Sequence, residues 1–365
     1  MLHSPYMKNP KVAIVYDRVN KWGGAERVLL SLRELYPNAT LFTSVYDPQG
    51  APWAHEFKDI KTSFLQRVSF ARKNHEYFAL LMPIAFETFD FSQFDLVISV
   101  TSEAAKGIIT GPNTLHICYC LTPTRYLWSG KKTYFDVQFK ELLSRPALAY
   151  LRRWDIAASK RADKMVGIST VVQKRIKKYY GRESNIIFPP VTVERFVENS
   201  PVKKNYYLLV SRLVKYKKVD LAVRAFNSLN KKLIIVGKGR EEKHLKRIAH
   251  KNITFLPEVN DIELSKLYAE ARALVFPQVE DFGLVAVEAM ASGTPVIAYK
   301  KGGALDTVQE GITGVFFNKQ TVESLINTVK GFDATQFSPK ILRKSAQKFS
   351  KQRFLTEFAT MLRQP

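Results

Sequence analysis

The sequence is poor in cysteine, and this shortage limits the chemistry that it can support. Only 2 of its 365 residues are cysteines, Cys118 and Cys120, separated by one residue of an apolar run. A strand would place both side chains on one face, where a disulfide would be strained, so we expect a reduced pair. No second Cys or His cluster accompanies the pair, and a metal site is therefore not predicted.

Long hydrophobic segments are also missing. The longest apolar run, Phe78 to Phe86, has nine residues and is interrupted by Pro83, which is too short to cross a bilayer. The opening residues, MLHSPYMKNP, have no apolar core, so no secretion signal is expected. These features predict a cytoplasmic protein and leave association with a membrane surface open.

Acidic residues are scarce relative to basic ones. The chain has 33 Asp and Glu against 56 Lys and Arg, a net charge of +23. This excess favours anionic partners: nucleic acid, anionic lipid or phosphorylated substrates. Charge alone does not choose among them.

The basic residues gather in two regions. Lys61 to His75 contains four Lys or Arg and no acid, interleaved with Phe64, Leu65, Val68 and Phe70. Lys140 to Arg182 contains twelve Lys or Arg against three acids. Basic residues beside exposed apolar ones suit the headgroup layer of an anionic membrane, and the first region favours this interpretation. The alternative is a solvated basic surface over ordinary core residues, which stays equally open for the second region.

The first half of the chain alternates strands and helices. Lys11 to Tyr16 predicts a strand, followed by a loop ending in glycine and a helix over Ala25 to Leu35, the opening of a doubly wound domain. Further strands are expected at 39–43, 96–100, 115–120, 164–168 and 185–188. The pair Gly23 and Gly24 does not match the G-x-G-x-x-G fingerprint, which disfavours a nicotinamide cofactor.

A second alternation begins at Tyr206. Strands are expected at 206–211, 233–237, 253–256, 273–276 and 295–299, with helices at 219–229, 241–249 and 261–271. The predicted fold class is α/β, with two Rossmann-like doubly wound domains facing a central cleft. The predicted domains are 1–190 and 191–338, followed by closing helices at 339–365 that pack back toward the first domain.

One stretch, FPQVEDFGLVAVEAMASGTPVIAYKKGG at 276–303, combines a strand end, a loop and a helix that opens at Gly283. Backbone N–H groups at Phe282 to Val285 would face an anion, so the stretch predicts a phosphate site. Glu280 lies in the loop and Glu288 about two turns into the helix, so we interpret them as separate acceptors for hydroxyl groups. The alternative is a buried turn with two solvated glutamates.

Several motifs together resemble one known family. They are SRLVKYK at 211–217, the glycine turn 237–239, the pair Glu280 and Glu288 with seven residues between them, and Gly302 to Leu305. This combination resembles the donor-binding half of glycosyltransferase family 4. Together with YCLTPTRYLW at 119–128, these motifs are most similar to those of bacterial O-antigen mannosyltransferases. The resemblance covers nearly the whole chain and implies the GT-B architecture and a retaining reaction.

The resemblance implies roles for individual residues. Arg212 and Lys217 match cations that hold the donor's diphosphate in place of a metal, and Glu280 matches a glutamate near the donor sugar. These three are the predicted catalytic residues, and no metal or cofactor is implied. Glu288 matches a glutamate that binds the ribose, and glycines allow close approach of the backbone. The predicted donor-binding residues are Gly23, Gly24, Gly237, Phe282, Gly283, Leu284, Val285 and Glu288.

One position departs from this pattern. Leu121 stands where the mannosyltransferase branch has a histidine facing the reacting sugar. His116 should point to the opposite face of its strand and is expected to be a core residue. Thr122, Arg125 and Tyr126 are predicted cleft residues, with loop packing as the alternative.

The predicted reaction moves mannose from GDP-mannose, with retention, to a polyprenyl-diphosphate-linked glycan acceptor. The first domain offers no pair of acids for a double displacement, so a front-face substitution fits better. The protein is predicted to associate peripherally with the inner face of an anionic cell membrane. One alternative is the same fold with a UDP sugar, and another is a catalytically silent homologue that acts in binding or assembly. Nucleic acid is disfavoured as a partner because Glu280 and Glu288 would repel its phosphates.

Overall fold

The protein folds into two compact units in the computed structural model, which describes residues 10–129, 145–196 and 203–363. One unit comprises Met1–Pro189 with Phe354–Pro365, and the other comprises Pro190–Arg353. The opening residues of the chain and positions 140–144 of the second basic region lie outside the described residues.

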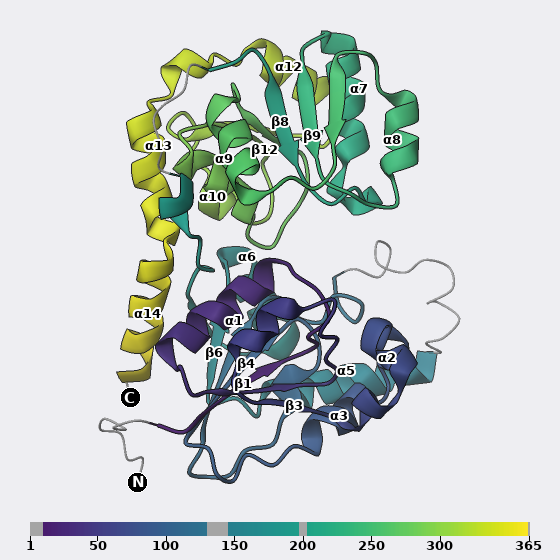
Figure 1. Ribbon diagram of the computed structural model, residues 1–365, viewed down its shortest axis with the longest axis vertical. Coiled ribbons are helices and arrows are strands. Elements are labelled where there is room, and N and C mark those ends of the chain that lie inside the picture. The colour runs from purple at the N-terminus through teal and green to yellow at the C-terminus, as the bar shows by residue number, and fades with distance from the viewer. Residues whose placement is uncertain (1–9, 130–144, 197–202, 364–365) are drawn as a thin grey trace. The chain divides into compact units, whose positions relative to one another are not determined.

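The N-terminal unit is built on a seven-stranded parallel sheet of order β3-β2-β1-β4-β5-β6-β7 (Figure 1). Its strands are β1 (Val12–Tyr16), β2 (Thr40–Thr43), β3 (Ile60–Thr62), β4 (Leu96–Thr101), β5 (Leu115–Cys120), β6 (Lys164–Gly167) and β7 (Asn185–Ile186). The sequence did not predict β3, because its three residues at the edge of the sheet are only partly apolar and half exposed.

Helices cover this sheet: α1 (Gly24–Leu35), α2 (Ser69–Lys73), α3 (Met82–Glu87), α5 (Arg145–Ser159), α6 (Thr170–Tyr180) and α14 (Lys351–Arg363). Strands β1 and β4 are buried along their whole length, as expected for a parallel sheet covered on both faces. Phe354 and Phe358 of α14 pack their rings 5.8 and 6.4 Å from that of Tyr119 on β5. The end of the chain therefore completes the core of the N-terminal unit.

The C-terminal unit has a six-stranded parallel sheet of order β10-β9-β8-β11-β12-β13. Its strands are β8 (Tyr207–Val210), β9 (Leu233–Val236), β10 (Ile253–Leu256), β11 (Leu274–Phe276), β12 (Val296–Tyr299) and β13 (Gly314–Phe317). Its helices are α7 (Val219–Leu229), α8 (Glu242–Ile248), α9 (Asp261–Glu270), α10 (Leu284–Ala291), α11 (Ala304–Thr307), α12 (Val322–Lys330) and α13 (Pro339–Ala346). The predicted class, α/β with two doubly wound parallel sheets, is confirmed.

Each sheet has a point where the strand order reverses. The reversal lies between β1 and β4 in the first sheet and between β8 and β11 in the second. In doubly wound folds the loops at the carboxyl ends of these strands diverge and leave a crevice in which ligands bind. The two reversals are therefore the places at which to look for functional side chains.

Candidate functional site

The loop after β8 carries the two cations that the sequence singles out. Arg212 is exposed, and its Nη2 donates a hydrogen bond to the hydroxyl of Tyr216 at 2.5 Å. Lys217 is only 9% exposed, and its ammonium group forms an ion pair with the carboxylate of Glu280. That ammonium also lies 5.3 Å from the centre of the Tyr216 ring. The fold thus brings Lys217 to a carboxylate that is far away in sequence.

Glycines after β9 fix the position of this loop. Gly237 has a φ of 139°, and a Cβ there would lie 2.0 Å from the carbonyl oxygen of Ser211. A Cβ on Gly239 would lie 2.1 Å from the carbonyl oxygen of Leu213. Both contacts are too close for any side chain, so the glycine turn packs directly on the backbone beside Arg212.

A second pair of glycines holds the loop after β11. The N–H of Gly303 donates a hydrogen bond to the carbonyl of Glu280 at 2.8 Å. A Cβ on Gly303 would lie 2.3 Å from the carbonyl oxygen of Phe282. Gly302 has a φ of 72°, and a Cβ there would lie 2.5 Å from the carbonyl oxygen of Glu280. These contacts fix the backbone from which the Glu280 carboxylate projects toward Lys217.

Helix α10 begins immediately after this loop. Gly283 precedes the helix with a φ of 102°, a conformation that favours glycine. The first-turn N–H groups of Leu284 and Val285 have no partner within the helix, and the positive end of its dipole lies there. Phe282 is buried, with its ring 5.5 Å from that of Phe349. The phosphate site expected at this helix start stays a prediction.

Glu288 lies deeper than Glu280 and has different neighbours. It is 2% exposed, and its Oε2 accepts a hydrogen bond from the hydroxyl of Tyr268 at 2.9 Å. Its Oε1 lies 3.9 Å from Nη2 of Arg195. The sequence did not point to Tyr268 or Arg195, because neither belongs to a local motif and only the fold brings them to α10.

In the N-terminal unit, the glycine pair lies at the start of α1. Gly23 precedes the helix in an extended conformation that any residue can adopt, and a Cβ there would lie 3.1 Å from Oε2 of Glu26. Gly24 is the first residue of the helix. Glu26 is buried and accepts a hydrogen bond from the hydroxyl of Tyr16 at 2.9 Å. Burial raises the pKa of Glu26 above its ordinary value.

The predicted cleft residues follow β5 in the same unit. Thr122 is buried and accepts a hydrogen bond from Nη1 of Arg175 at 3.2 Å. Arg125 and Tyr126 are half-buried, and burial together with the charge of Glu103 raises the pKa of Tyr126 well above its ordinary value. The N–H of Leu121 donates to the carbonyl of Thr101 at 2.8 Å.

A buried ion pair holds this segment in place. Nζ of Lys106 lies 2.5 Å from Oδ1 of Asp155, and both side chains are 1% exposed. The same carboxylate accepts hydrogen bonds from Thr124 at 2.8 Å, from the Trp128 indole at 2.7 Å and from the Tyr180 hydroxyl at 2.8 Å. Asp155 of α5 thus fastens the segment 124–128 to the N-terminal core.

Two expectations about β5 are confirmed. Cys118 and Cys120 are buried and are not joined in a disulfide. His116 is fully buried, its Nε2 lies 2.8 Å from the Ser99 hydroxyl, and burial lowers its pKa to about 3. It is therefore a neutral core residue.

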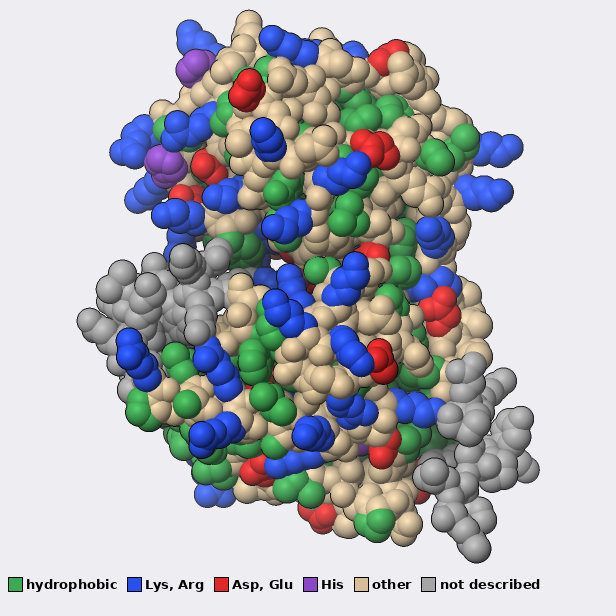
Figure 2. All heavy atoms as spheres, turned by 180° about the vertical axis from the view of Figure 1, so that it is seen from behind, with side chains coloured by type: hydrophobic (Ala, Val, Ile, Leu, Met, Phe, Trp, Pro, Cys, Tyr) green, Lys and Arg blue, Asp and Glu red, His purple; other side chains and the backbone are tan. Residues whose placement is uncertain are grey.

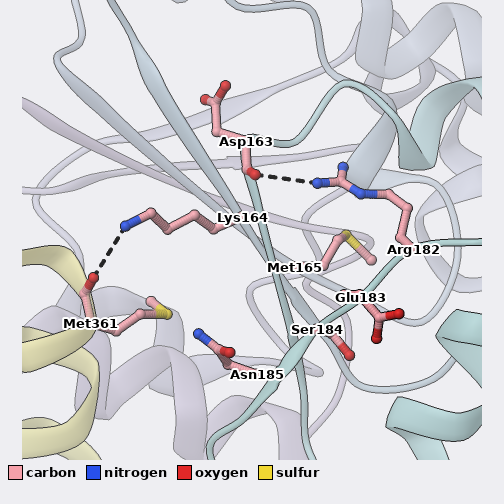
Figure 3. Close-up of a pocket in the computed structure, with 8 residues that line it drawn as sticks. All are labelled: Asp163, Lys164, Met165, Arg182, Glu183, Ser184, Asn185 and Met361. Carbon is pink, nitrogen blue, oxygen red and sulfur yellow. Dashed lines mark hydrogen bonds between the residues drawn. The ribbon is translucent and has the colours of Figure 1, made fainter. Parts of the chain in front are cut away.

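A groove lies where β6 and β7 begin, at the β7 edge of the N-terminal sheet. Its volume is about 480 Å³, and its lining comprises Asp163, Lys164, Met165, Arg182, Glu183, Ser184, Asn185 and Met361 (Figure 3). Nζ of Lys164 donates a hydrogen bond to the carbonyl of Met361 at 3.3 Å. Nη2 of Arg182 donates one to the carbonyl of Asp163 at 3.2 Å. No predicted site residue lines this groove.

Among the described residues, no group of three or more His, Cys, Asp or Glu is arranged to hold a metal ion. No helix within the described ranges has the length and apolar character needed to cross a membrane.

Comparison with solved structures identifies the fold. The Anabaena protein HepE in complex with UDP superimposes with a TM-score of 0.71, covering 96% of this chain and 99% of that one, at 18% identity. Sucrose-phosphate synthase from Thermosynechococcus elongatus gives a TM-score of 0.75 over 97% and 98% of the two chains, at 17% identity. The two units together therefore have the GT-B fold.

Sequence comparison finds relatives of the C-terminal unit. Residues 191–350 match the model of the Glycosyl transferases group 1 family. A GDP-mannose-dependent α-(1-6)-phosphatidylinositol monomannoside mannosyltransferase from Mycobacterium tuberculosis is 29% identical over 198 residues, which are 46% of this chain and 51% of that protein. The alignment thus spans about half of that relative's length. The C-terminal unit thus matches the group 1 glycosyltransferases, which agrees with the family 4 resemblance; the O-antigen branch stays a prediction.

Proposed function

We propose that this protein is a retaining hexosyltransferase that uses a nucleotide-sugar donor. The observation that carries the proposal is the ion pair between Lys217 and Glu280 at the strand-order reversal of the C-terminal sheet, with Arg212 on the same loop as Lys217 and α10 beginning shortly after Glu280. Two cations and a helix N-terminus suit a diphosphate, and the adjacent carboxylate suits the hydroxyl groups of a sugar. A group 1 glycosyltransferase domain in the same unit supports this reading.

The residues have distinct proposed roles. Arg212 and Lys217 bind the donor's diphosphate and stabilise the charge that develops as the nucleotide leaves. Glu280 orients the donor sugar, and Glu288 receives the ribose hydroxyls. N–H groups from Phe282 to Val285 complete the phosphate contacts. The remaining proposed donor contacts are made by Gly23, Gly24 and Gly237.

The proposed donor is GDP-mannose and the proposed acceptor is a lipid-linked glycan of cell-surface polysaccharide synthesis. The mycobacterial relative carries GDP-mannose in its name, and this favours the guanine nucleotide. The structure of HepE with UDP favours the second candidate, a UDP sugar. Because Leu121 stands in place of the expected histidine, a third candidate is a catalytically silent homologue that acts in binding or assembly.

A thermal-shift series separates the donors. We expect GDP-mannose at 1 mM, roughly 100 times a micromolar-range Kd, to stabilise the protein by about 2.7 kcal/mol, equivalent to several degrees. UDP-glucose and ADP-glucose at the same concentration should have little effect. Stabilisation by a UDP sugar alone would contradict the choice of GDP-mannose as donor. A donor-hydrolysis assay on the same samples then tests whether the bound donor is turned over.

We also propose that the N-terminal unit docks on the cytoplasmic face of an anionic membrane. Seven large hydrophobic side chains between the loop after β3 and α3 are 40% to 54% exposed: Phe64, Val68, Phe70, Tyr77, Leu80, Leu81 and Ile84. Leu65, which the sequence placed with them, is instead buried. Lys61, Arg67, Arg72 and Lys73 lie among them. Lys and Arg side chains also outnumber acidic ones on the face in Figure 2.

Vesicle sedimentation tests this docking. We expect the protein to sediment with vesicles of phosphatidylglycerol and phosphatidylcholine and to remain in solution with phosphatidylcholine alone, because each cation near the surface contributes about 1 kcal/mol. The double substitution Phe70→Glu and Leu80→Glu should weaken binding at least tenfold, roughly the loss of two apolar anchors. Ile262→Glu, at a side chain of α9 that is 85% exposed, is the control. Equal binding by the double variant would contradict the proposal.

A further inference from the structure

The strand-order reversal of the N-terminal sheet gathers a cluster of charged side chains that the sequence did not predict. Arg18 follows β1, and Glu103 follows β4, the neighbouring strand. Their side chains form an ion pair at 2.7 Å, and the side chain of Glu103 is 23% exposed. His75 closes one side, with Nε2 3.8 Å from Oε2 of Glu103. These groups lie where doubly wound folds bind ligands.

The backbone around the cluster is held by one buried carboxylate. Asp17 accepts hydrogen bonds from the N–H groups of Ser102, Glu103, Ala104 and Ala105 and from the Thr101 hydroxyl, at 2.7 to 3.0 Å. The loop after β4 therefore wraps around the end of β1 and cannot move independently of it. Such preorganisation positions Glu103 before any ligand arrives.

The charges point to a neutral ligand rather than an ion. Burial alone would raise the pKa of Glu103, but Arg18, His75 and Lys21 hold it well below its ordinary value. Glu103 therefore stays ionised and accepts hydrogen bonds. Beside it, Nε of Arg18 is a buried donor with no hydrogen-bond partner among the described residues. An adjacent donor and acceptor match vicinal hydroxyls, each of which can both donate and accept.

An exposed indole lies on the same loop. Trp22 is 53% exposed, which is unusual for so large an apolar side chain. It packs edge to face on Trp53, with ring centres 6.3 Å apart, and the Trp53 indole donates to the carbonyl of Lys21 at 2.9 Å. Trp53 thus fixes the loop while one face of Trp22 stays open. Trp22 lies four residues after Arg18 on the loop that follows β1, and a flat apolar surface on such a loop suits the apolar C–H face of a pyranose ring.

We propose that Arg18, Glu103 and Trp22 form a subsite that binds a neutral pyranose ring of the acceptor glycan. The identity of this ring as the acceptor rests on the proposed function. Glu103 and Arg18 bind its vicinal hydroxyls, and Trp22 packs against its apolar face. The subsite lies entirely within the N-terminal unit, and His75 and Asp17 are positioning residues that do not touch the ligand.

Saturation-transfer NMR with methyl α-D-mannopyranoside and methyl β-D-glucopyranoside tests the subsite. We expect the wild type to bind at least one glycoside, and Trp22→Ala and Glu103→Gln to weaken that binding about tenfold, the usual effect of losing a charged hydrogen bond or a stacking face. Trp22→Ala changes an exposed side chain and should leave folding intact. The controls are Tyr150→Ala and Glu183→Gln, both at exposed positions of the same unit.

Pyrophosphate binding, followed by thermal shift, separates this test from that of the proposed function. Because pyrophosphate should bind the cations of the C-terminal unit, the subsite variants should bind it as tightly as the wild type. Loss of pyrophosphate binding in Lys217→Ala alone supports the proposed function. The subsite is overturned if the wild type binds neither glycoside or if Trp22→Ala and Glu103→Gln bind them undiminished.

Discussion

Lys217→Ala is expected to lower hexose transfer about 100- to 1000-fold, the usual effect of removing one preorganised donor from a developing anion. The ammonium group is held in a largely buried position against Glu280, so water does not screen it and it needs no reorganisation during the reaction. We expect the loss mainly in kcat, because charge on the departing diphosphate grows in the transition state. The measurement is the steady-state rate of product formation at saturating donor.

Lys215→Ala is the matched control. Lys215 lies two residues earlier on the same turn but is exposed, so its removal should leave kcat near the wild-type value. Glu280→Ala should lower transfer as Lys217→Ala does, because it removes the partner that fixes the ammonium group. Donor turnover that is only at background level in the wild type and unchanged in both Lys217→Ala and Glu280→Ala would instead support a catalytically silent homologue.

Asp155→Ala is expected to lower the free energy of unfolding of the N-terminal unit by about 3–5 kcal/mol, because it leaves the Lys106 charge buried without its partner. Burial lowers the pKa of Lys106, but Asp155 more than offsets this, and the resulting pKa lies above its ordinary value. The substitution also removes the carboxylate that accepts from the Trp128 indole and the Tyr180 hydroxyl, and one of the two acceptors of the Thr124 hydroxyl. Urea unfolding followed by tryptophan fluorescence measures the change in the corresponding transition.

Two further variants distinguish a buried charge from general loss of packing. The double substitution Lys106→Met and Asp155→Leu removes both charges and should recover part of the lost stability. Glu183→Gln breaks an exposed ion pair with Lys177, in which Glu183 is 82% exposed, and should cost less than about 1 kcal/mol. A double variant as unstable as Asp155→Ala would contradict the role given to the buried Lys106 charge.

Local patterns predicted most of the fold because each element carries its own signal. The helix expected at 219–229 is α7 with the same bounds, and the strand expected at 115–120 is β5. The exceptions were weak signals: β3 is three residues long at the edge of its sheet, and β13 lies beyond the last strand that was expected. An edge strand buries little, so its sequence has little need to be apolar.

The sequence by itself determined the α/β class, the two doubly wound sheets and the motif residues Arg212, Lys217, Glu280 and Glu288. Periodicity and turn residues are local properties of the chain, and a motif is a fixed spacing along it. Only the tertiary structure decided which side chains meet: Lys217 with Glu280, Tyr268 with Glu288, and Arg18 with Glu103. These contacts join separate loops at the carboxyl ends of parallel strands, and no spacing along the sequence encodes them.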